Sequence, residues 1–140
     1  DHIPADKPNT CQVERNHPFD EGKLAEQMVK DTADAIASKA GGTWSYRVTN
    51  CDRSIGARLS GEIAQLHGNQ GMVSAPITLD LTGTAGQSFG VWNVGGLNLL
   101  LEGDANDYVG KGMTGGKLVI RPPSGSDFKT QDTSIVGNTC

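Results

Sequence analysis

The first candidate for chemistry in this sequence is a glycine run at residues 110–115 (GKGMTG), which has the spacing of the G-x-G-x-x-G dinucleotide fingerprint. That motif binds a pyrophosphate only where a strand feeds a helix whose N-terminus faces the phosphates. Here Gly116 extends the run, and residues 117–120 have strand composition and precede two prolines. Asp132, the one downstream acidic candidate, falls in a loop. We therefore predict a structural turn here, not a nucleotide site.

Two carboxylates, Asp104 and Asp107, flank Asn106 and suggest a metal site. Carboxylates and amides in a glycine-flanked turn more often accept hydrogen bonds from the backbone, so we predict turn chemistry. The run Asp52-Arg53-Ser54 follows a strand-like segment and predicts an ion pair or a cap.

No nucleophile is paired with a base. Three serines could serve as nucleophiles, and none lies in a G-x-S-x-G elbow or near a base in the sequence: Ser54, Ser60 and Ser88. Of the histidines, His67 beside Gly68 is typical of a turn or surface residue, and His2 and His17 lie in the N-terminal lead-in. We predict no catalytic, cofactor-binding or metal-binding residue in this chain.

Three cysteines, Cys11, Cys51 and Cys140, give an odd count without C-x-x-C spacing. Zinc, iron–sulfur and disulfide frameworks are poorly supported by that pattern. Free thiols are typical of a reducing cytosol, so we expect a cytoplasmic protein. The net charge of −4 and the lack of a basic run argue against nucleic-acid binding. No apolar stretch is long enough to span a bilayer, so we expect no membrane partner.

A sequence repeat indicates which secondary-structure elements would position these residues. An offset of 20 residues superimposes five small residues of the first copy (Gly83, Ala85, Gly90, Gly95, Gly96) on five of the second (Gly103, Ala105, Gly110, Gly115, Gly116). Each copy ends in an apolar strand, at residues 97–101 and 117–120. The period fits a β-solenoid or a leucine-rich repeat, and the second needs a helix or an Asn/Cys ladder that neither copy has. We predict a mainly β fold, a right-handed parallel β-helix.

Two registers are open between the copies. The offset of 20 places Leu97 beside Lys117, whereas a one-residue slip places Leu97 beside Leu118 and Leu99 beside Ile120. The slip reverses the buried face.

A single domain of three parts is expected. Residues 1–19 hold three prolines and are predicted to form an extended lead-in. Residues 20–42 carry apolar residues at helical spacing, with Asp20 as the expected N-cap, and predict one amphipathic helix. Residues 43–140 are assigned to β-helix rungs: an alternating strand from Thr43, a degenerate first rung at Ile55-Gly56, Gly61 and Ile63, the alternating strand Ile77–Leu81, and the two clear copies. A further rung is expected to begin at residues 135–137, after a loop at 124–133.

The last rung has no covering element, so we expect a fragment of a longer polypeptide, truncated at its C-terminus. We also expect self-association through the open solenoid end.

Five segments carry a family resemblance: residues 50–57 (NCDRSIGA), 67–71 (HGNQG), 83–93 (GTAGQSFGVWN), 103–112 (GDANDYVGKG) and 135–140 (IVGNTC). They closely resemble the C-terminal domain of the glutamate synthase large (α) subunit. The sequence of residues 90–93 (GVWN) resembles the bacterial NADPH-dependent form more closely than the plant ferredoxin-dependent form.

The resemblance implies a structural and interaction β-helix domain. Its parent enzyme makes two glutamates from glutamine and 2-oxoglutarate. The resemblance also implies FMN and an iron–sulfur cluster in the parent, and NADPH and FAD through the small subunit, none of them bound by this segment. Expected partners are the amidotransferase and flavin-binding domains of the parent chain. Cys11 does not begin the chain, so it is not expected to be the amidotransferase nucleophile.

Two alternatives stay open. One is a protein related to the glycine-rich β-helix component of formylmethanofuran dehydrogenase, and the other is a carbohydrate-active β-helix enzyme.

Overall fold

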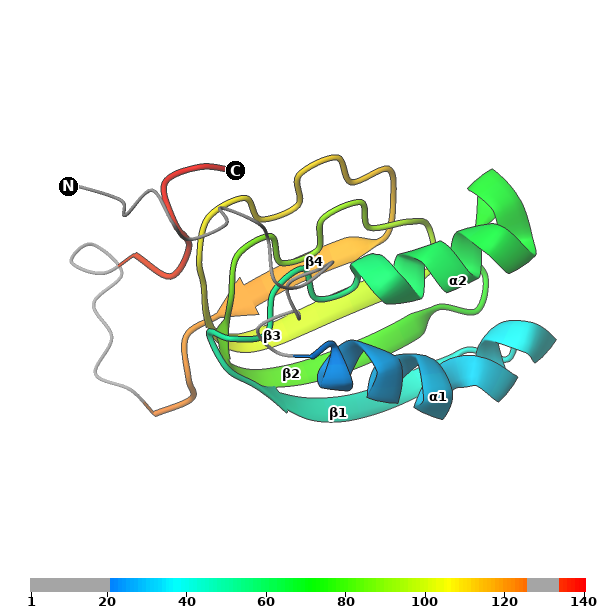
Figure 1. Cartoon of the computed structure of the whole chain (residues 1–140), viewed down its shortest axis with the longest axis horizontal. Helices are drawn as coiled ribbons and strands as arrows, with labels where there is room; N and C mark the ends of the chain where they lie inside the picture. The colour runs from blue at the N-terminus through cyan, green and yellow to red at the C-terminus, as the bar shows by residue number, and fades with distance from the viewer. Residues whose placement is uncertain (1–20, 126–133) are drawn as a thin grey trace, which may run out of the picture.

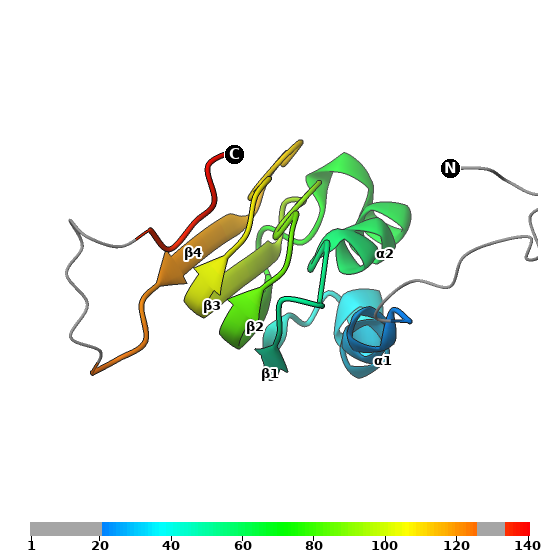
Figure 2. The same ribbon diagram turned by 60° about the vertical axis from the view of Figure 1, so that its left-hand side comes forward.

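A computed structural model describes residues 21–125 and 134–140 of the chain. Those residues form two helices and a four-stranded parallel sheet (Figure 1). The elements in order are α1 (Lys23–Ser38), β1 (Gly42–Val48), α2 (Ala57–His67), a 3₁₀ turn (Gly68–Gln70), β2 (Ile77–Ala85), β3 (Leu97–Ala105) and β4 (Lys117–Arg121). The strands lie in chain order, and both helices lie on one side of the sheet, toward β1 and β2 (Figure 2).

The predicted right-handed β-helix is wrong. A solenoid coil needs strands on more than one face, whereas each copy of this repeat supplies one strand to one sheet, followed by turns. The opposite wall of the core is made by α1, α2 and these turns. The glycines of the repeat therefore allow the left-handed conformations of stacked turns in a small α/β fold.

The helix expected within residues 20–42 is present as α1. Its inward face carries Met28, Thr32 and Ile36, all buried, at the four-residue spacing of one helical face. The residue preceding the helix is Gly22, in a left-handed conformation. The predicted cap, Asp20, lies outside the described residues, as does the lead-in at 1–19.

The degenerate rung predicted at Gly61 and Ile63 is also wrong, because these residues belong to α2. Leu59 and Ile63, four residues apart, are both buried against the sheet. Gly61 lies on the outer side of the helix, where an added Cβ would meet nothing within 4 Å. Burial of the apolar pair outweighs the roughly 1 kcal/mol that glycine costs a helix.

Strand register follows the repeat only in part. β2 pairs with β3 at an offset of 20, from Ile77 opposite Leu97 to Ala85 opposite Ala105. β4 instead pairs with Leu99 opposite Leu118, an offset of 19, which differs from both predicted registers. This register keeps Leu118 and Ile120 on the face that carries the leucines of β3, and it leaves Lys117 on the open face beside Asn98.

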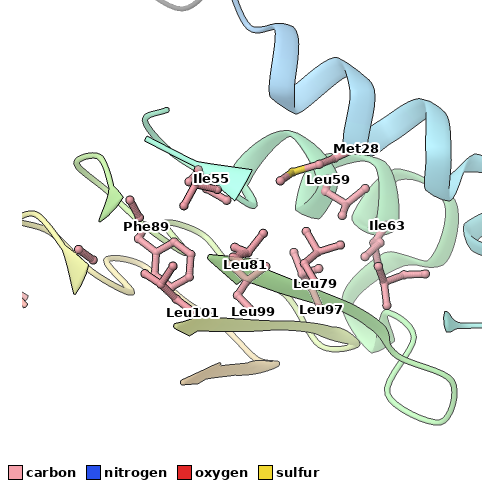
Figure 3. Close-up of a cluster of buried hydrophobic side chains, with 14 of the residues drawn as sticks. Met28, Ile55, Leu59, Ile63, Leu79, Leu81, Phe89, Leu97, Leu99 and Leu101 are labelled. Carbon is pink, nitrogen blue, oxygen red and sulfur yellow. The ribbon is translucent and has the colours of Figure 1, made fainter. Parts of the chain in front are cut away.

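The core lies between the sheet and the helices (Figure 3). Leucines from β2 and β3 form its floor, and Met28 of α1 and Ile63 of α2 cover them. Phe89, from the turn after β2, closes one end and is fully buried. Burying each large side chain of this kind contributes roughly 1.5–3 kcal/mol.

Candidate functional site

Most polar groups proposed from the sequence lie in a column of stacked turns beyond the strand ends. Three segments have the same conformation: Ser54-Ile55-Gly56, Ser88-Phe89-Gly90 and Tyr108-Val109-Gly110. In each, the first and third residues have positive φ. The Ser54 N–H donates to Gln87 and the Gly90 N–H to Ile55, while the Ser88 N–H donates to Asp107 and the Gly110 N–H to Phe89. The expected likeness of Ile55-Gly56 to Phe89-Gly90 is therefore confirmed, although the rung built on it is not.

The column continues into the C-terminal segment. Ala105 pairs with Val136, and the Tyr108 N–H donates to the Thr139 carbonyl at 2.5 Å. Residues 135–139 thus stack on the turn after β3. The further rung expected to begin at residues 135–137 is present only as the single bridge between Ala105 and Val136. This segment is separated from β4 by a connection that begins at Pro122. Residues 126–133 of that connection lie outside the described residues.

The glycine run at 110–115 is a turn between β3 and β4, and no helix follows it. The Gly110, Thr114 and Gly115 N–H groups donate to protein carbonyls, of Phe89 and of Asn93. A phosphate cradle needs such groups free and aimed at the ligand. The predicted turn is therefore present at this run. Asp132 lies outside the described residues.

Asn93 holds the next part of the column together, a role that the sequence did not predict. Its side chain is fully buried, and its Nδ2 donates to the carbonyls of Leu97 at 2.8 Å and Gly115 at 3.0 Å. Its own carbonyl accepts from the Thr114 N–H at 2.8 Å. The side-chain Oδ1 has no protein partner. The only signal in the sequence was a polar residue directly before an apolar-Gly-Gly turn.

The predicted turn chemistry is seen for Asp107 but not for Asp104, which lies in β3 and bonds a side chain of β2. Asp104 accepts from the Thr84 hydroxyl at 2.6 Å, and Asp107 accepts from the Asn138 N–H at 3.0 Å. The ion pair or cap predicted at Asp52-Arg53-Ser54 is not found in the described residues, where Gly56 precedes α2 without a side-chain cap. Asp52 accepts from the N–H and hydroxyl of Thr49, closing the turn after β1. Across residues 21–125 and 134–140, no three His, Cys, Asp or Glu side chains come together as a metal site.

The serine, histidine and cysteine candidates lie apart. Ser54 and Ser88 occupy two left-handed turns, and Ser60 is buried in α2. His67 ends α2, and its Nε2 lies 2.6 Å from the Ile36 carbonyl at the end of α1. Cys51 is half-buried and Cys140 exposed, both as free thiols. Cys11, His2 and His17 lie outside the described residues.

Charged groups join the helices to each other and to β1. Arg58 of α2 pairs with Glu26 of α1 and with Glu62. The Tyr46 hydroxyl of β1 donates to Asp31 of α1 at 2.9 Å. Burial, followed by this hydrogen bond and the negative charge of Asp31, raises the pKa of Tyr46 well above its usual value. These groups stabilise the packing of the elements on one another.

The hollow between α1, α2 and the turn at Asp52 has a volume of only about 10 Å³, the limit for one water molecule. Three larger hollows lie at the surface of the described residues: about 260 Å³ along β2, β3 and β4, about 470 Å³ between residues 104–107 and 134–138, and about 310 Å³ beside Val48 and Thr84. Neither helix in the described part of the chain combines the length and apolar character needed to cross a bilayer.

The conformation of the glycine-rich turns agrees with what sequence comparison finds. Residues 22–140 match the family described as GXGXG motif. The chain belongs to this family. The GXGXG domain is 50% identical over 110 residues to ferredoxin-dependent glutamate synthase 2 of Synechocystis sp., covering 79% of this chain and 7% of that protein. It is 42% identical over 129 residues to the chloroplastic ferredoxin-dependent glutamate synthase of Oryza sativa subsp. japonica, covering 91% of this chain and 8% of that one.

A third relative, the glutamate synthase [NADH] of Schizosaccharomyces pombe, is 47% identical over 93 residues, which are 66% of this chain and 4% of that protein. The resemblance to glutamate synthases is thereby confirmed. These relatives use different electron donors by name, and the GXGXG domain spans less than a tenth of each.

Proposed function

We propose that this GXGXG domain is a structural and interaction segment of a glutamate synthase, placed near the C-terminus of the large subunit and not itself catalytic. The 50% identity to a glutamate synthase over 110 residues carries the proposal. The relatives described above are all glutamate synthases, which favours this function over a component of formylmethanofuran dehydrogenase or a carbohydrate-active enzyme.

The non-catalytic role is supported by what the polar groups do. The amides of the glycine run, Asp107 and the buried Asn93 hydrogen-bond one turn to the next, and Asp104 joins β3 to β2 through Thr84. Groups committed to such bonds are not poised for proton transfer or nucleophilic attack, which require a nucleophile and a base within reach of each other.

In this proposal the reaction belongs to the parent enzyme, which transfers the amide nitrogen of glutamine to 2-oxoglutarate. FMN and an iron–sulfur cluster act in other domains, and NADPH and FAD act through the small subunit of a bacterial, cytoplasmic enzyme. The partners of the GXGXG domain are the amidotransferase and flavin-binding domains.

The test compares the isolated chain with the parent polypeptide expressed from its own gene. The parent is expected to form glutamate from glutamine and 2-oxoglutarate, and the isolated chain is expected to release no ammonia from glutamine and to bind no flavin. Stoichiometric FMN on the isolated chain, or ammonia release above a buffer blank, would overturn the non-catalytic role. Turnover of the parent with NADPH, NADH and reduced ferredoxin in parallel identifies its electron donor.

A further inference from the structure

Two adjacent turns carry an exposed group of large side chains. Trp92 lies in the turn after β2, and Tyr108, Lys111 and Met113 lie in the turn after β3; we call these four residues the aromatic–lysine patch. The Trp92 side chain is 66% exposed, Tyr108 38% and Met113 36%. The core of the domain leaves these residues outside while it buries Phe89 completely.

Contacts between the two turns link these four residues. The Trp92 N–H donates to the Lys111 carbonyl at 2.9 Å, which fixes the two turns together. The Trp92 ring lies against Gly112, where an added Cβ would come within 2.7 Å of its Cδ1. The Lys111 Nζ lies 5.0 Å from the centre of the Tyr108 ring, within cation–π range. Met113 follows in the same turn, with its N–H bonded to Gly110.

The repeat shows that the fold does not require these side chains. Tyr108 has φ 64°, and the equivalent stacked positions are Ser54 at 52° and Ser88 at 64°. Trp92 has φ 54°, and the residue twenty positions on, Gly112, has φ 65°. Glycine and serine satisfy the same left-handed turns, and a bulky residue there is an outlier. Two aromatic residues thus hold disfavoured conformations although neither is buried, and Trp92 is the more exposed of the two.

The patch also carries a positive charge that forms no ion pair. The equivalent of Lys111 one copy earlier is Val91, which is buried. Lys111 lies over the Tyr108 ring and pairs with no carboxylate in the described residues; Asp107, next to Tyr108 in the sequence, instead accepts from the Asn138 N–H. A surface of exposed aromatics with one such cation complements an apolar group with a carboxylate next to it.

We propose that the aromatic–lysine patch docks an acidic protein segment, in which an apolar side chain packs on Trp92 and a carboxylate pairs with Lys111. Docking of two patches on each other is disfavoured because it brings two lysines together. A nucleic acid is disfavoured by a single lysine on a chain of net charge −4. The identity of the partner rests on the proposed function, so we look for the segment in the parent polypeptide.

The experiment combines hydroxyl-radical footprinting with carbodiimide coupling of amines to carboxylates, on the isolated chain and on the parent. We expect oxidation of Trp92 and Met113 to fall several-fold in the parent, while Leu66, exposed on α2, is oxidised equally in both. We expect Lys111, and not the exposed Lys117, to couple to an Asp or Glu outside residues 22–140. Equal oxidation of Trp92 in both samples overturns the proposal, as does coupling to a second copy or protection of Trp92 by an oligothymidylate.

Two variants separate docking from folding. Trp92→Gly and Tyr108→Ser install the residue types found at equivalent positions, so the isolated variants should melt no lower than the unmodified domain. In the parent, both variants should lose the Lys111 cross-link. A clear loss of melting temperature in both isolated variants would mean that the fold needs these rings, and the argument fails. If the parent makes no glutamate but the cross-link forms, the proposed function falls and the patch stands.

Discussion

Glycine is required in this domain where close packing and a left-handed backbone occur together, and it is not required where both are absent. Gly96 has φ 91°, and a Cβ there would lie 2.5 Å from the Met72 carbonyl carbon. We predict that Gly96→Ala destabilises the domain by about 1–3 kcal/mol, the usual cost of a forced conformation. Gly61→Ala, in the open face of α2, should instead stabilise it by about 0.5–1 kcal/mol. Urea unfolding of the two variants decides between these signs.

Gly61 is a better control than Gly22, the glycine that precedes α1, because Gly22 has φ 66°. A side chain at Gly22 would have open space but a disfavoured backbone conformation. If Gly61→Ala proves as damaging as Gly96→Ala, close packing and left-handed backbone do not explain the need for glycine at Gly96.

Tyr46 makes the stability of the domain depend on pH in the alkaline range. Burial and Asp31 raise the pKa of its hydroxyl in the folded state, so the native domain keeps a proton that the unfolded chain loses near pH 10. The contribution to stability is complete below about pH 10 and is lost as the pH rises above it. Tyr46→Phe should therefore flatten the fall in stability between neutral pH and about pH 11. Parallel urea titrations of both proteins measure it, and equal slopes would contradict the role of Tyr46.

Among the elements, the stack of turns depends on Asn93 more than on any ion pair. Asn93→Ala removes the donor from two carbonyls and opens a small buried space. We expect a loss of about 1–3 kcal/mol for each carbonyl left unsatisfied. Asn98→Ala, a half-buried position on the open face of β3, should stay within about 0.5 kcal/mol. The melting temperatures of the two variants are compared. A similar loss of stability in both would contradict a particular role of Asn93 in the stack of turns.

The strands and turns could be predicted from the sequence because their signals were local. The alternation of Trp44, Tyr46 and Val48 marks β1, and matched glycines give the register of β2 on β3. α2 was missed because Gly61 and Ile63 match the repeat by position, while the deciding fact, burial of Leu59 with Ile63, needs the folded core. The roles of Asn93 and of the aromatic–lysine patch could not be predicted for the same reason. The sequence shows that a side chain is polar or aromatic, but whether it is buried or exposed depends on which turns stack on each other.

The fold class could not be settled locally either. A 20-residue copy with one strand and glycine turns suits a solenoid coil, and it also suits a parallel sheet whose connections are turns instead of helices. The difference lies in what covers the far side of the leucines. In this domain α1 and α2 cover it, through contacts such as Met28 and Ile63 that are distant in sequence from β3.

At the scale of the whole molecule, the β4 edge determines whether copies associate. No strand within the described residues pairs with the outer edge of β4, and unpaired edges recruit other strands. The sequence predicts self-association through an open solenoid end; in the sheet that the structure shows, the corresponding exposed edge is that of β4. The edge carries Lys117 and Arg121, and antiparallel pairing of two β4 strands about Val119 sets Lys117 of one copy opposite Arg121 of the other. Like charges placed opposite each other oppose that pairing.

We therefore predict that replacing both charges promotes association that the natural edge resists. The double variant Lys117→Thr, Arg121→Thr keeps strand propensity and the apolar run between, so its sedimentation or light scattering should rise steeply with concentration. Since Arg121 also pairs with Glu102, the single variant Glu102→Gln serves as control for that lost ion pair and should remain unassociated. High salt should shift the unmodified chain toward the behaviour of the double variant by screening the two cations. A double variant that stays monomeric at every concentration would show that another part of the chain already protects this edge.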